Sequence, residues 1–237
     1  MDVNAHPVMT EKAPTSRKRG GRPSAEQAGE ADRRILDAAT TLFLRSGFDA
    51  TSCDQVLALA GAGKATLYAR YANKEALFSA VVRRMVEQDR MPATDVRRDV
   101  PVRERLRAAG LELLQHALAA ESIALKRVCI ATAHRLPELA TMVDRMERDR
   151  GTARVAHALA GPEPDPGKAE LAAAVAARFI DMVVVPQQMH ALVVDDREQL
   201  DAAARRRVDD AVDLFSRAGR LDAFEAHDAS RVPKPGS

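Results

Sequence analysis

A cation, a hydroxyl group and a phenol follow one another at Lys64, Thr66 and Tyr68. If this segment is helical, Leu67 and Tyr71 lie four residues apart and share one face. With that face turned inward, the residues left to face outward are Lys64, Ala65, Thr66, Tyr68 and Ala69. Lysine pairs with phosphate groups, and hydroxyl groups hydrogen-bond to phosphates and base edges. The spacing therefore predicts a surface that contacts DNA.

A second short helix is expected directly before this segment. Thr51, with Asp54 three residues later, has the spacing of a capping box at a helix start. The apolar stripe of this helix would be Val56, Leu57, Leu59 and Ala60. The run Gly61-Ala62-Gly63 then interrupts the pattern, because glycine reaches the positive φ that a helix end requires. Two short helices around a glycine turn, over about residues 52–71, indicate a helix-turn-helix whose second helix enters the major groove.

Two longer helices are expected to support this pair. The first spans Ser24 to Ser46, with Ser24 as its cap and Gly47 at its end. Its inner stripe would be Ile35, Leu36, Ala39, Leu42 and Phe43. The second begins after Asn73, a good helix cap, and runs to about Asp89. These helices would hold the reading helix at a fixed angle.

The remainder of the chain is also expected to be helical. Aromatic residues are only 3% of the chain, Trp is absent, and no run alternates with a period of two. The expected helices are 102–120, 122–134, 137–160, 166–194 and 197–219, with a breaker loop at 161–167. Pro186 should kink or split the fourth of these helices. The fold class is therefore all-α, with residues 24–90 as a DNA-binding domain, 91–227 as a second helical domain and 228–237 as a frayed tail.

The composition argues against several other classes of protein. The chain has no GxSxG, P-loop or dinucleotide-binding glycine pattern, and no nucleophile–base pair can be placed, so we expect no enzyme. Its histidines and its two cysteines, Cys53 and Cys129, lack metal-ligand spacing, so neither a metal, a cofactor nor a disulfide is expected. The most apolar stretch, 179–194, contains Asp181 and Pro186 and is no membrane span. With no secretory h-region at the N-terminus, we expect a cytoplasmic, nucleoid-associated protein.

Residues 35–78 resemble the N-terminal domain of TetR/AcrR-type one-component regulators. The matching stretches are ILDAATTLFLRSGFDATS, from Ile35 to Ser52, and AGAGKATLYARYANKEALF, from Ala60 to Phe78. Two positions depart from the family pattern. Members commonly carry Ser or Thr where this chain has Gly63, which can still cap a helix but offers no hydroxyl group to a phosphate. Members also carry Gly where this chain has Ala65, whose methyl group can touch a thymine methyl group.

The resemblance implies a homodimer that binds a palindromic operator, most often as a repressor released by a small-molecule effector. Its two recognition helices would enter successive major grooves about 34–36 Å apart. Lys74 is similar to the family's phosphate-contacting lysine, and the alternative is an exposed lysine on a solvated turn. The residues expected to meet DNA are Thr51, Ser52, Lys64, Ala65, Thr66, Tyr68, Ala69 and Lys74. The segment 126–146 also resembles the regulatory domain of one TetR/AcrR branch, and the last two long helices would form the dimer interface.

We expect residues 1–23 to form a disordered basic arm. Its cations are Arg17, Lys18, Arg19 and Arg22, and its Gly-Arg-Pro end is similar to arms that lay arginine into a narrow minor groove. The alternative is a solvated tail with no DNA contact. Residues 1–90 carry 14 basic and 11 acidic residues, so the positive excess of the chain belongs to its DNA-binding half.

A ligand pocket is expected between the helices of the second domain. Its candidate lining is Phe179, Met182, Met189 and Met142, with His116, Gln187 and His190 as polar groups. The alternative is that these residues are ordinary core or dimer contacts. Two other functions remain open, namely a dimeric DNA-binding protein without an effector, and a helical-bundle enzyme or scaffold with an incidental basic face.

Overall fold

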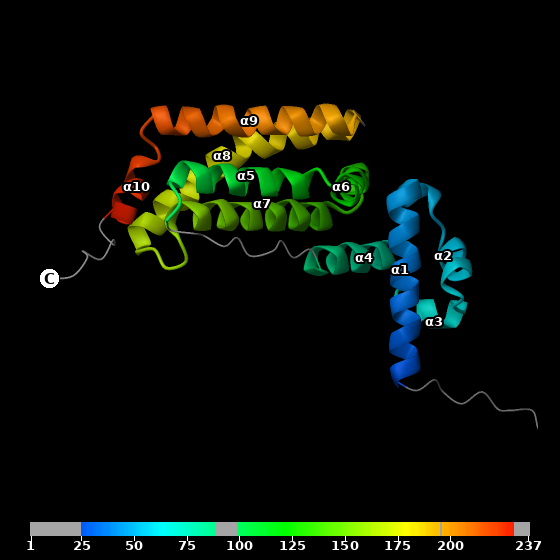
Figure 1. Ribbon diagram of the computed structural model, residues 1–237. Coiled ribbons are helices and arrows are strands. Elements are labelled where there is room, and N and C mark those ends of the chain that lie inside the picture. Colours follow the sequence, from blue (N-terminus) through cyan, green and yellow to red (C-terminus); the bar gives the residue numbers. More distant parts are fainter. Residues whose placement is uncertain (1–24, 89–98, 195, 230–237) are drawn as a thin grey trace, which may run out of the picture.

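The computed structural model describes residues 25–88, 99–194 and 196–229, and its described residues form helices and no strand (Figure 1). The helices are α1 (Ala25–Ala50), α2 (Cys53–Ala60), α3 (Lys64–Tyr68), α4 (Lys74–Gln88), α5 (Val102–Ala117), α6 (Ala120–Thr132), α7 (Pro137–Ala160), α8 (Pro166–Val193), α9 (Arg197–Arg217) and α10 (Asp222–Ala229). The expected all-α class with a helix-turn-helix domain and a C-terminal helical domain is confirmed.

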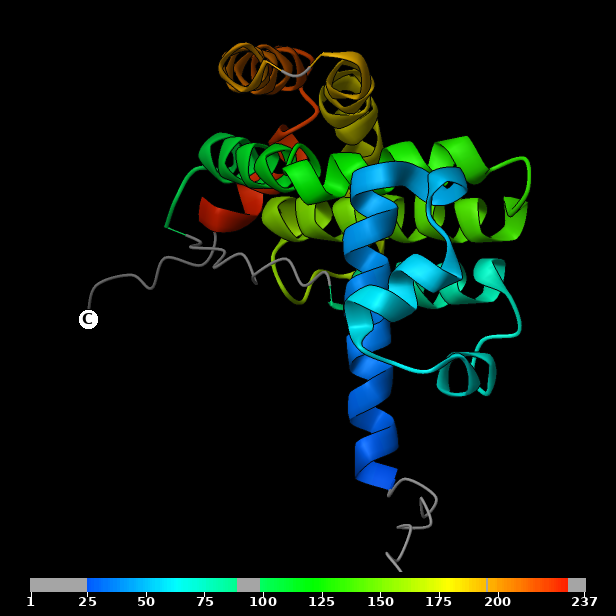
Figure 2. The same ribbon diagram turned by 90° about the vertical axis from the view of Figure 1, so that its right-hand side faces the viewer.

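Helices α1 to α4 form the N-terminal domain, in which the long α1 supports the short α2 and α3 (Figure 2). Gly47 has a φ of 81° and breaks the helical path of α1, as expected, although the chain resumes helical turns as far as Ala50. The rings of Phe43, Phe48 and Phe78 pack together at the centre of this domain, with centroid distances of 5.0–5.9 Å. Buried aromatic clusters of this kind fix the angle between α1 and α4.

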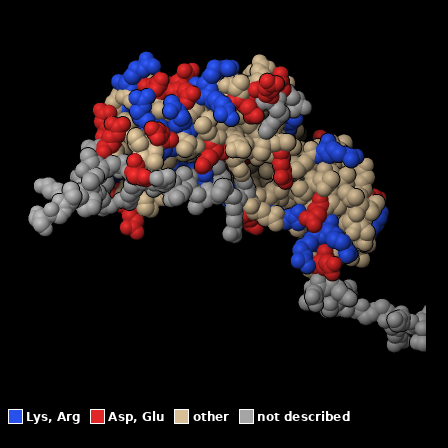
Figure 3. Space-filling model, viewed as in Figure 1, with Lys and Arg blue, Asp and Glu red and all other residues tan. Residues whose placement is uncertain are grey.

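The C-terminal domain is a bundle in which α5, α7, α8 and α9 lie side by side (Figure 1). Its core residues include Leu106, Leu114, Phe179 and Val208, all fully buried. Acidic and basic side chains are intermixed on the surface over α9 and α5 (Figure 3). Two ion pairs join these helices, Arg103 with Asp213 at 2.5 Å and Arg107 with Asp209 at 2.7 Å.

The two domains share a hydrophobic core. Leu125, Val128 and Cys129 of α6 are buried against the same cluster as Phe43 and Phe48 of α1. Burial raises the pKa of the Cys129 thiol to about 11, with the nearby Glu147 carboxylate adding to the rise. The C-terminal domain therefore packs directly on the N-terminal domain, with α6 against α1.

Helix α8 runs through Pro186 without a break, so of the two expected outcomes, a kink or a split, the split is wrong. Proline lacks the N–H that would bond to the carbonyl group of Met182, four residues earlier. The guanidinium group of Arg207 in α9 donates to that Met182 oxygen at 3.2 Å. The carbonyl group freed by the proline therefore has a partner from the neighbouring helix.

Other differences from the expected helices lie at ends and surfaces. Helix α10 was not expected, and it covers the end of the bundle with Phe224, which is fully buried, as is Leu221 directly before the helix. Leu171 of α8 and Leu214 of α9 are 39% and 52% exposed. Residues 228 and 229, expected in the frayed tail, belong to α10, and the remainder of that tail lies outside the described residues.

Candidate DNA-binding surface and ligand cavity

The helices α2 and α3, with the glycine turn between them, are called the reading unit below. Its first helix, α2, begins one residue later than the sequence pattern indicates. Ser52 is the N-cap: its hydroxyl group accepts from the Gln55 amide at 3.2 Å, and its own amide donates to the Gln55 side chain at 2.8 Å. Thr51 is instead buried, and its hydroxyl group donates to the Gly47 carbonyl oxygen at 2.8 Å. The predicted box of Thr51 and Asp54 is therefore wrong, because Thr51 closes the kink of α1.

A glycine turn joins α2 to α3, as the sequence predicts. Gly61 ends α2 in the left-handed conformation, with a φ of 59°, and Ala62 N–H donates to the Leu57 oxygen at 3.1 Å. Gly63 caps α3 with extended backbone and no side-chain hydrogen bond. Helix α3 ends at Tyr68 rather than Tyr71, although the amide of Tyr71 still bonds to the Leu67 oxygen at 2.9 Å.

The outward face of α3 agrees with the sequence pattern. Leu67 is fully buried beneath it, and Tyr68 is 51% exposed. The exposed members of the predicted face are Lys64, Ala65, Tyr68 and Ala69, while Thr66 is half-buried. In α2, Leu59 is 57% exposed, so its assignment to the apolar stripe is wrong. A helix of eight residues turns only a narrow face to the core, and Val56, Leu57 and Ala60 fill it.

The ammonium group of Lys64, at the start of α3, lies 2.9 Å from the carboxylate of Asp54 in α2. Both side chains are more than two-thirds exposed, at 69% and 68%. The hydrogen bond to Asp54, followed by the charge of this carboxylate, raises the pKa of Lys64. Lys64 is therefore a solvent-facing cation at the start of α3, and the ion pair links α3 to the start of α2.

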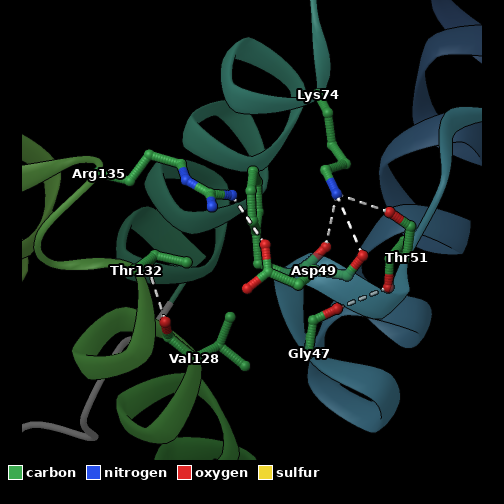
Figure 4. A network of polar contacts seen from close by, with 8 residues as sticks. Gly47, Asp49, Thr51, Lys74, Val128, Thr132 and Arg135 are labelled. Carbon is green, nitrogen blue, oxygen red and sulfur yellow. Dashed lines mark hydrogen bonds and ion pairs between the residues drawn. The ribbon is translucent and has the colours of Figure 1, made fainter.

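Lys74 is engaged within the domain (Figure 4). Its ammonium group donates to the carbonyl oxygens of Phe48 at 2.9 Å and Thr51 at 3.0 Å, and more weakly to that of Asp49 at 3.5 Å. It also lies 4.3 Å from the centroid of the Phe48 ring. The alternative of an exposed lysine on a solvated turn is therefore wrong, because the ammonium group donates to the backbone at the end of α1. The phosphate contact stays a prediction.

The phenol of Tyr71, three residues after the end of α3, attaches this segment to α1. Its hydroxyl group donates to the Asp32 carboxylate at 2.8 Å. Burial, and then the hydrogen bond to Asp32, raise the pKa of Tyr71 to about 12. The side chain of Arg70, two residues after the end of α3, lies 3.0 Å from the same carboxylate, and this residue is exposed. Arg70 is a basic residue at the reading helix that the sequence pattern did not single out, because it lies beyond the amphipathic stripe.

The basic arm cannot be placed on this surface. Arg17, Lys18, Arg19 and Arg22 lie outside the described residues, as does Ser24, the predicted cap of the first helix. Of the predicted DNA contacts, the structure brings together Ser52, Lys64, Ala65, Tyr68 and Ala69 as exposed residues around α2 and α3, with Thr66 half-buried among them.

A cavity of about 680 Å³ lies where the C-terminal bundle meets α1 and α4. Its lining includes His116 and Met189, two of the predicted pocket residues. The other five predicted residues lie elsewhere. Met142 packs in the core beside α1, and Phe179 packs edge-on against Phe215 inside the bundle. Met182 packs on the bundle core, Gln187 is buried and His190 is exposed. Those five assignments are wrong as descriptions of this cavity, because the helix period alone does not distinguish core from cavity positions.

The sequence did not identify most of the lining. Apolar lining comes from Met85, Leu113, Leu125, Ile180 and Val184, and charged lining from Arg84, Glu121, Lys126, Asp144, Glu147, Arg148 and Arg150. The lining comes from α1 and from α4 to α8, and no local sequence pattern reports how these helices pack together. The described residues hold no group of His, Cys, Asp or Glu that could bind a metal ion, and none of their helices is long and apolar enough to cross a membrane.

Two family models match the chain over most of its length. Residues 35–81 match the model described as bacterial regulatory proteins of the tetR family, and residues 104–219 match that of the AefR-like transcriptional repressor C-terminal domain. The chain belongs to the TetR family. Its members are helix-turn-helix transcriptional regulators rather than enzymes. The first match covers most of the helices α1 to α4, and the second covers most of the C-terminal bundle, which lines part of the cavity.

Individual relatives agree with this assignment. The HTH-type transcriptional repressor ComR of Escherichia coli (strain K12) is 37% identical over 81 residues, which are 34% of this chain and 37% of that protein. The match thus spans well under half of the curated relative. A TetR-family regulator structure from Mesorhizobium loti MAFF303099 has a TM-score of 0.59 at 21% identity, over 79% of this chain and 98% of that one. The flavonoid-responsive regulator FrrA has a TM-score of 0.59 at 25% identity, over 80% and 97%.

Proposed function

We propose that this TetR-family protein is a homodimeric repressor that binds a palindromic operator and leaves it when a small molecule binds. The observation that carries the DNA-binding part is the exposed face of α3, held on a glycine turn over a buried Leu67. Lys64 and Tyr68 would supply the contacts to phosphates and base edges, with Ser52 at the start of α2 meeting the backbone. Thr66 would contact DNA through the part of its side chain that is exposed.

The proposed dimer uses α8 and α9. Of the eight large hydrophobic side chains that are exposed among the described residues, three lie on these two helices and outside the cavity lining: Leu171, Val193 and Leu214. Exposed apolar side chains gathered on neighbouring elements favour a protein interface. A two-fold dimer through this face would present two copies of α3 to successive major grooves of one duplex.

The proposed effector site is the cavity beneath α4. A cavity of about 680 Å³ suits a drug-sized molecule, and its mixed apolar and polar lining is typical of ligand sites. The flavonoid-responsive regulator FrrA, which shares the fold, supports a small-molecule response in this chain too. The proposed dimer has two states, which differ in the spacing between its two copies of α3. An effector that binds one state more tightly than the other would change the DNA affinity by that difference in binding free energy.

The experiment is a footprint of the purified protein on the DNA upstream of its own gene, against random DNA at near-physiological salt. A protected region with two-fold symmetry supports the operator and the dimer together. Equal affinity for both DNAs, lost steeply as salt rises, would contradict sequence-specific regulation and leave only electrostatic attraction. The arm residues Arg17, Lys18, Arg19 and Arg22 are proposed to add a salt-sensitive part of the affinity, which their joint removal measures.

A further inference from the structure

An acidic side chain lies beside the first residue of α3. Asp54, in the first turn of α2, is 2.9 Å from the ammonium group of Lys64, where α3 begins. In a helix-turn-helix, the residues at the start of the second helix contact base edges in the major groove. A carboxylate at this place is unexpected in a DNA-binding surface, because the phosphate groups of DNA repel it.

The fold of the reading unit does not depend on this carboxylate. The sequence pattern placed Asp54 in a capping box, but Ser52 and Gln55 form that box. Gly61, in the left-handed conformation, ends α2 without help from a side chain. An ion pair between side chains as exposed as those of Asp54 and Lys64 contributes little to stability. The pair is therefore available for DNA recognition.

The pair presents a donor and an acceptor side by side. The two carboxylate oxygens of Asp54 lie 2.9 Å and 3.2 Å from the nitrogen of Lys64. An ammonium group has three donors and a carboxylate accepts about four hydrogen bonds, so each group can still bond to a third partner. Their opposite charges offset each other, so that the pair meets less repulsion from phosphates than a lone carboxylate does.

A G·C base pair offers the complementary pattern in the major groove. Guanine presents two acceptors, N7 and O6, and cytosine presents its N4 amino group as a donor. Lysine donates to the guanine acceptors, and aspartate accepts from the cytosine amino group. An A·T pair fits less well, because its amino donor is on the purine and the thymine adds a methyl group.

We propose that Asp54 and Lys64 together read one G·C base pair in each half-site of the operator. Lys64 donates to guanine, and Asp54 accepts from the N4 amino group of cytosine. Asp54 is then a specificity-determining residue, although its charge alone opposes DNA binding. This inference rests on the proposed function, because it names one base pair of the proposed operator.

Selection from a pool of duplexes with randomised sequence tests the proposal on the full-length protein. The wild type should enrich a palindrome with a G·C pair at one fixed position of each half-site. It should bind this site about tenfold more tightly than the same site with any other base pair at that position.

Two variants test which side chain reads which base. Asp54→Asn should lose the preference for cytosine and accept adenine in its place, because an amide side chain pairs with N6 and N7 of adenine. Lys64→Met should lose the preference for guanine at the same position, because a thioether donates no hydrogen bond. Both variants should thus lose about tenfold in discrimination at one shared base pair.

Asp49→Asn is the matched control. Asp49 is an exposed aspartate of the same domain, and its partner at 2.8 Å is Arg135, between α6 and α7, rather than a residue of α3. This variant also removes one negative charge and one exposed ion pair, yet it should keep the base preferences of the wild type. The urea unfolding midpoints of all three variants should stay near that of the wild type, because exposed ion pairs contribute little to stability.

Three results would overturn the proposal: a palindrome without a fixed G·C pair, base preferences in Asp54→Asn equal to those of the wild type, or losses at different positions in the two variants. An equal loss of affinity for every sequence in Lys64→Met would also overturn it, since that result indicates a phosphate contact. A wild type that enriches no palindrome would contradict the proposed function, and this inference with it. A palindrome read alike by Asp54→Asn and the wild type would keep the function and remove this inference alone.

Discussion

The guanidinium group of Arg135 lies 2.8 Å from the carboxylate of Asp49 and so ties the turn between α6 and α7 to the end of α1 (Figure 4). Arg135 also lies 5.3 Å from the centroid of the Phe48 ring, the ring that Lys74 approaches from the DNA-binding domain. A residue of the C-terminal domain and a residue of the N-terminal domain thus meet at one aromatic side chain. These contacts join the C-terminal domain to the N-terminal domain.

Breaking this ion pair should cost little stability. The side chains of Arg135 and Asp49 are 42% and 78% exposed, and exposed pairs contribute about 0.2–1 kcal/mol. We expect a coupling energy in that range from a double-mutant cycle of Arg135→Gln and Asp49→Asn, measured by urea unfolding. A coupling energy above about 2 kcal/mol would mean that the pair is shielded from solvent, contrary to this geometry.

Lys74 should stabilise the fold more than a surface lysine does. Lys74→Met removes all three hydrogen bonds to the carbonyl groups that follow Gly47, and should lower the free energy of unfolding by about 1–3 kcal/mol. Lys64→Met is the matched control, because Lys64 is solvent-facing, and its unfolding midpoint should stay near that of the wild type. If Lys74→Met left stability unchanged but weakened DNA binding, the family's phosphate-contacting role would be the better description of Lys74.

Tyr71 should make stability depend on alkaline pH. Its pKa of about 12 lies above the value near 10 of an unfolded chain, so the native state holds the proton more tightly. The stabilisation is therefore fully present below about pH 10 and is lost as the pH rises through about 12. Tyr71→Phe should lower the urea midpoint at pH 7, and its difference from the wild type should shrink above pH 10. A difference that stays constant up to pH 11.5 would contradict this role of the hydroxyl group.

The proposed dimer face is tested by two leucines of similar exposure. Leu214 on α9 is 52% exposed and Leu59 on α2 is 57% exposed. Leu214→Glu should shift the protein toward monomer in sedimentation experiments, because a charge buried at an apolar interface is costly. Leu59→Glu should sediment like the wild type, because α2, which carries Leu59, lies far from α8 and α9 (Figure 1). Equal behaviour of the two variants would remove α9 from the proposed interface.

The sequence predicted the reading unit well because its positions are determined locally. The glycine turn, the buried Leu67 and the exposed Tyr68 follow from helix period and from the positive φ at Gly61. The choice of Ser52 over Thr51 as cap did not follow, since both are good caps and only the kink at Gly47 buries Thr51.

The cavity could not be predicted in the same way. Phe179 and Ile180 are neighbours on α8, yet only Ile180 lines the cavity, because the packing of α8 against α5 and α7 decides which one reaches it. The role of Lys74 was also hidden, since its partners are backbone carbonyl groups some 25 residues earlier in the chain.

The most direct measurement compares operator and random DNA binding for three variants over a range of salt concentrations. Tyr68→Ala should lose operator affinity by about 1–3 kcal/mol with little change on random DNA, and Lys64→Ala should reduce the salt slope by about one. Arg217→Ala, a change at an exposed arginine of α9 whose side chain is 82% exposed, should match the wild type on both DNAs. If Tyr68→Ala kept full preference for the operator, α3 would not be the helix that reads DNA.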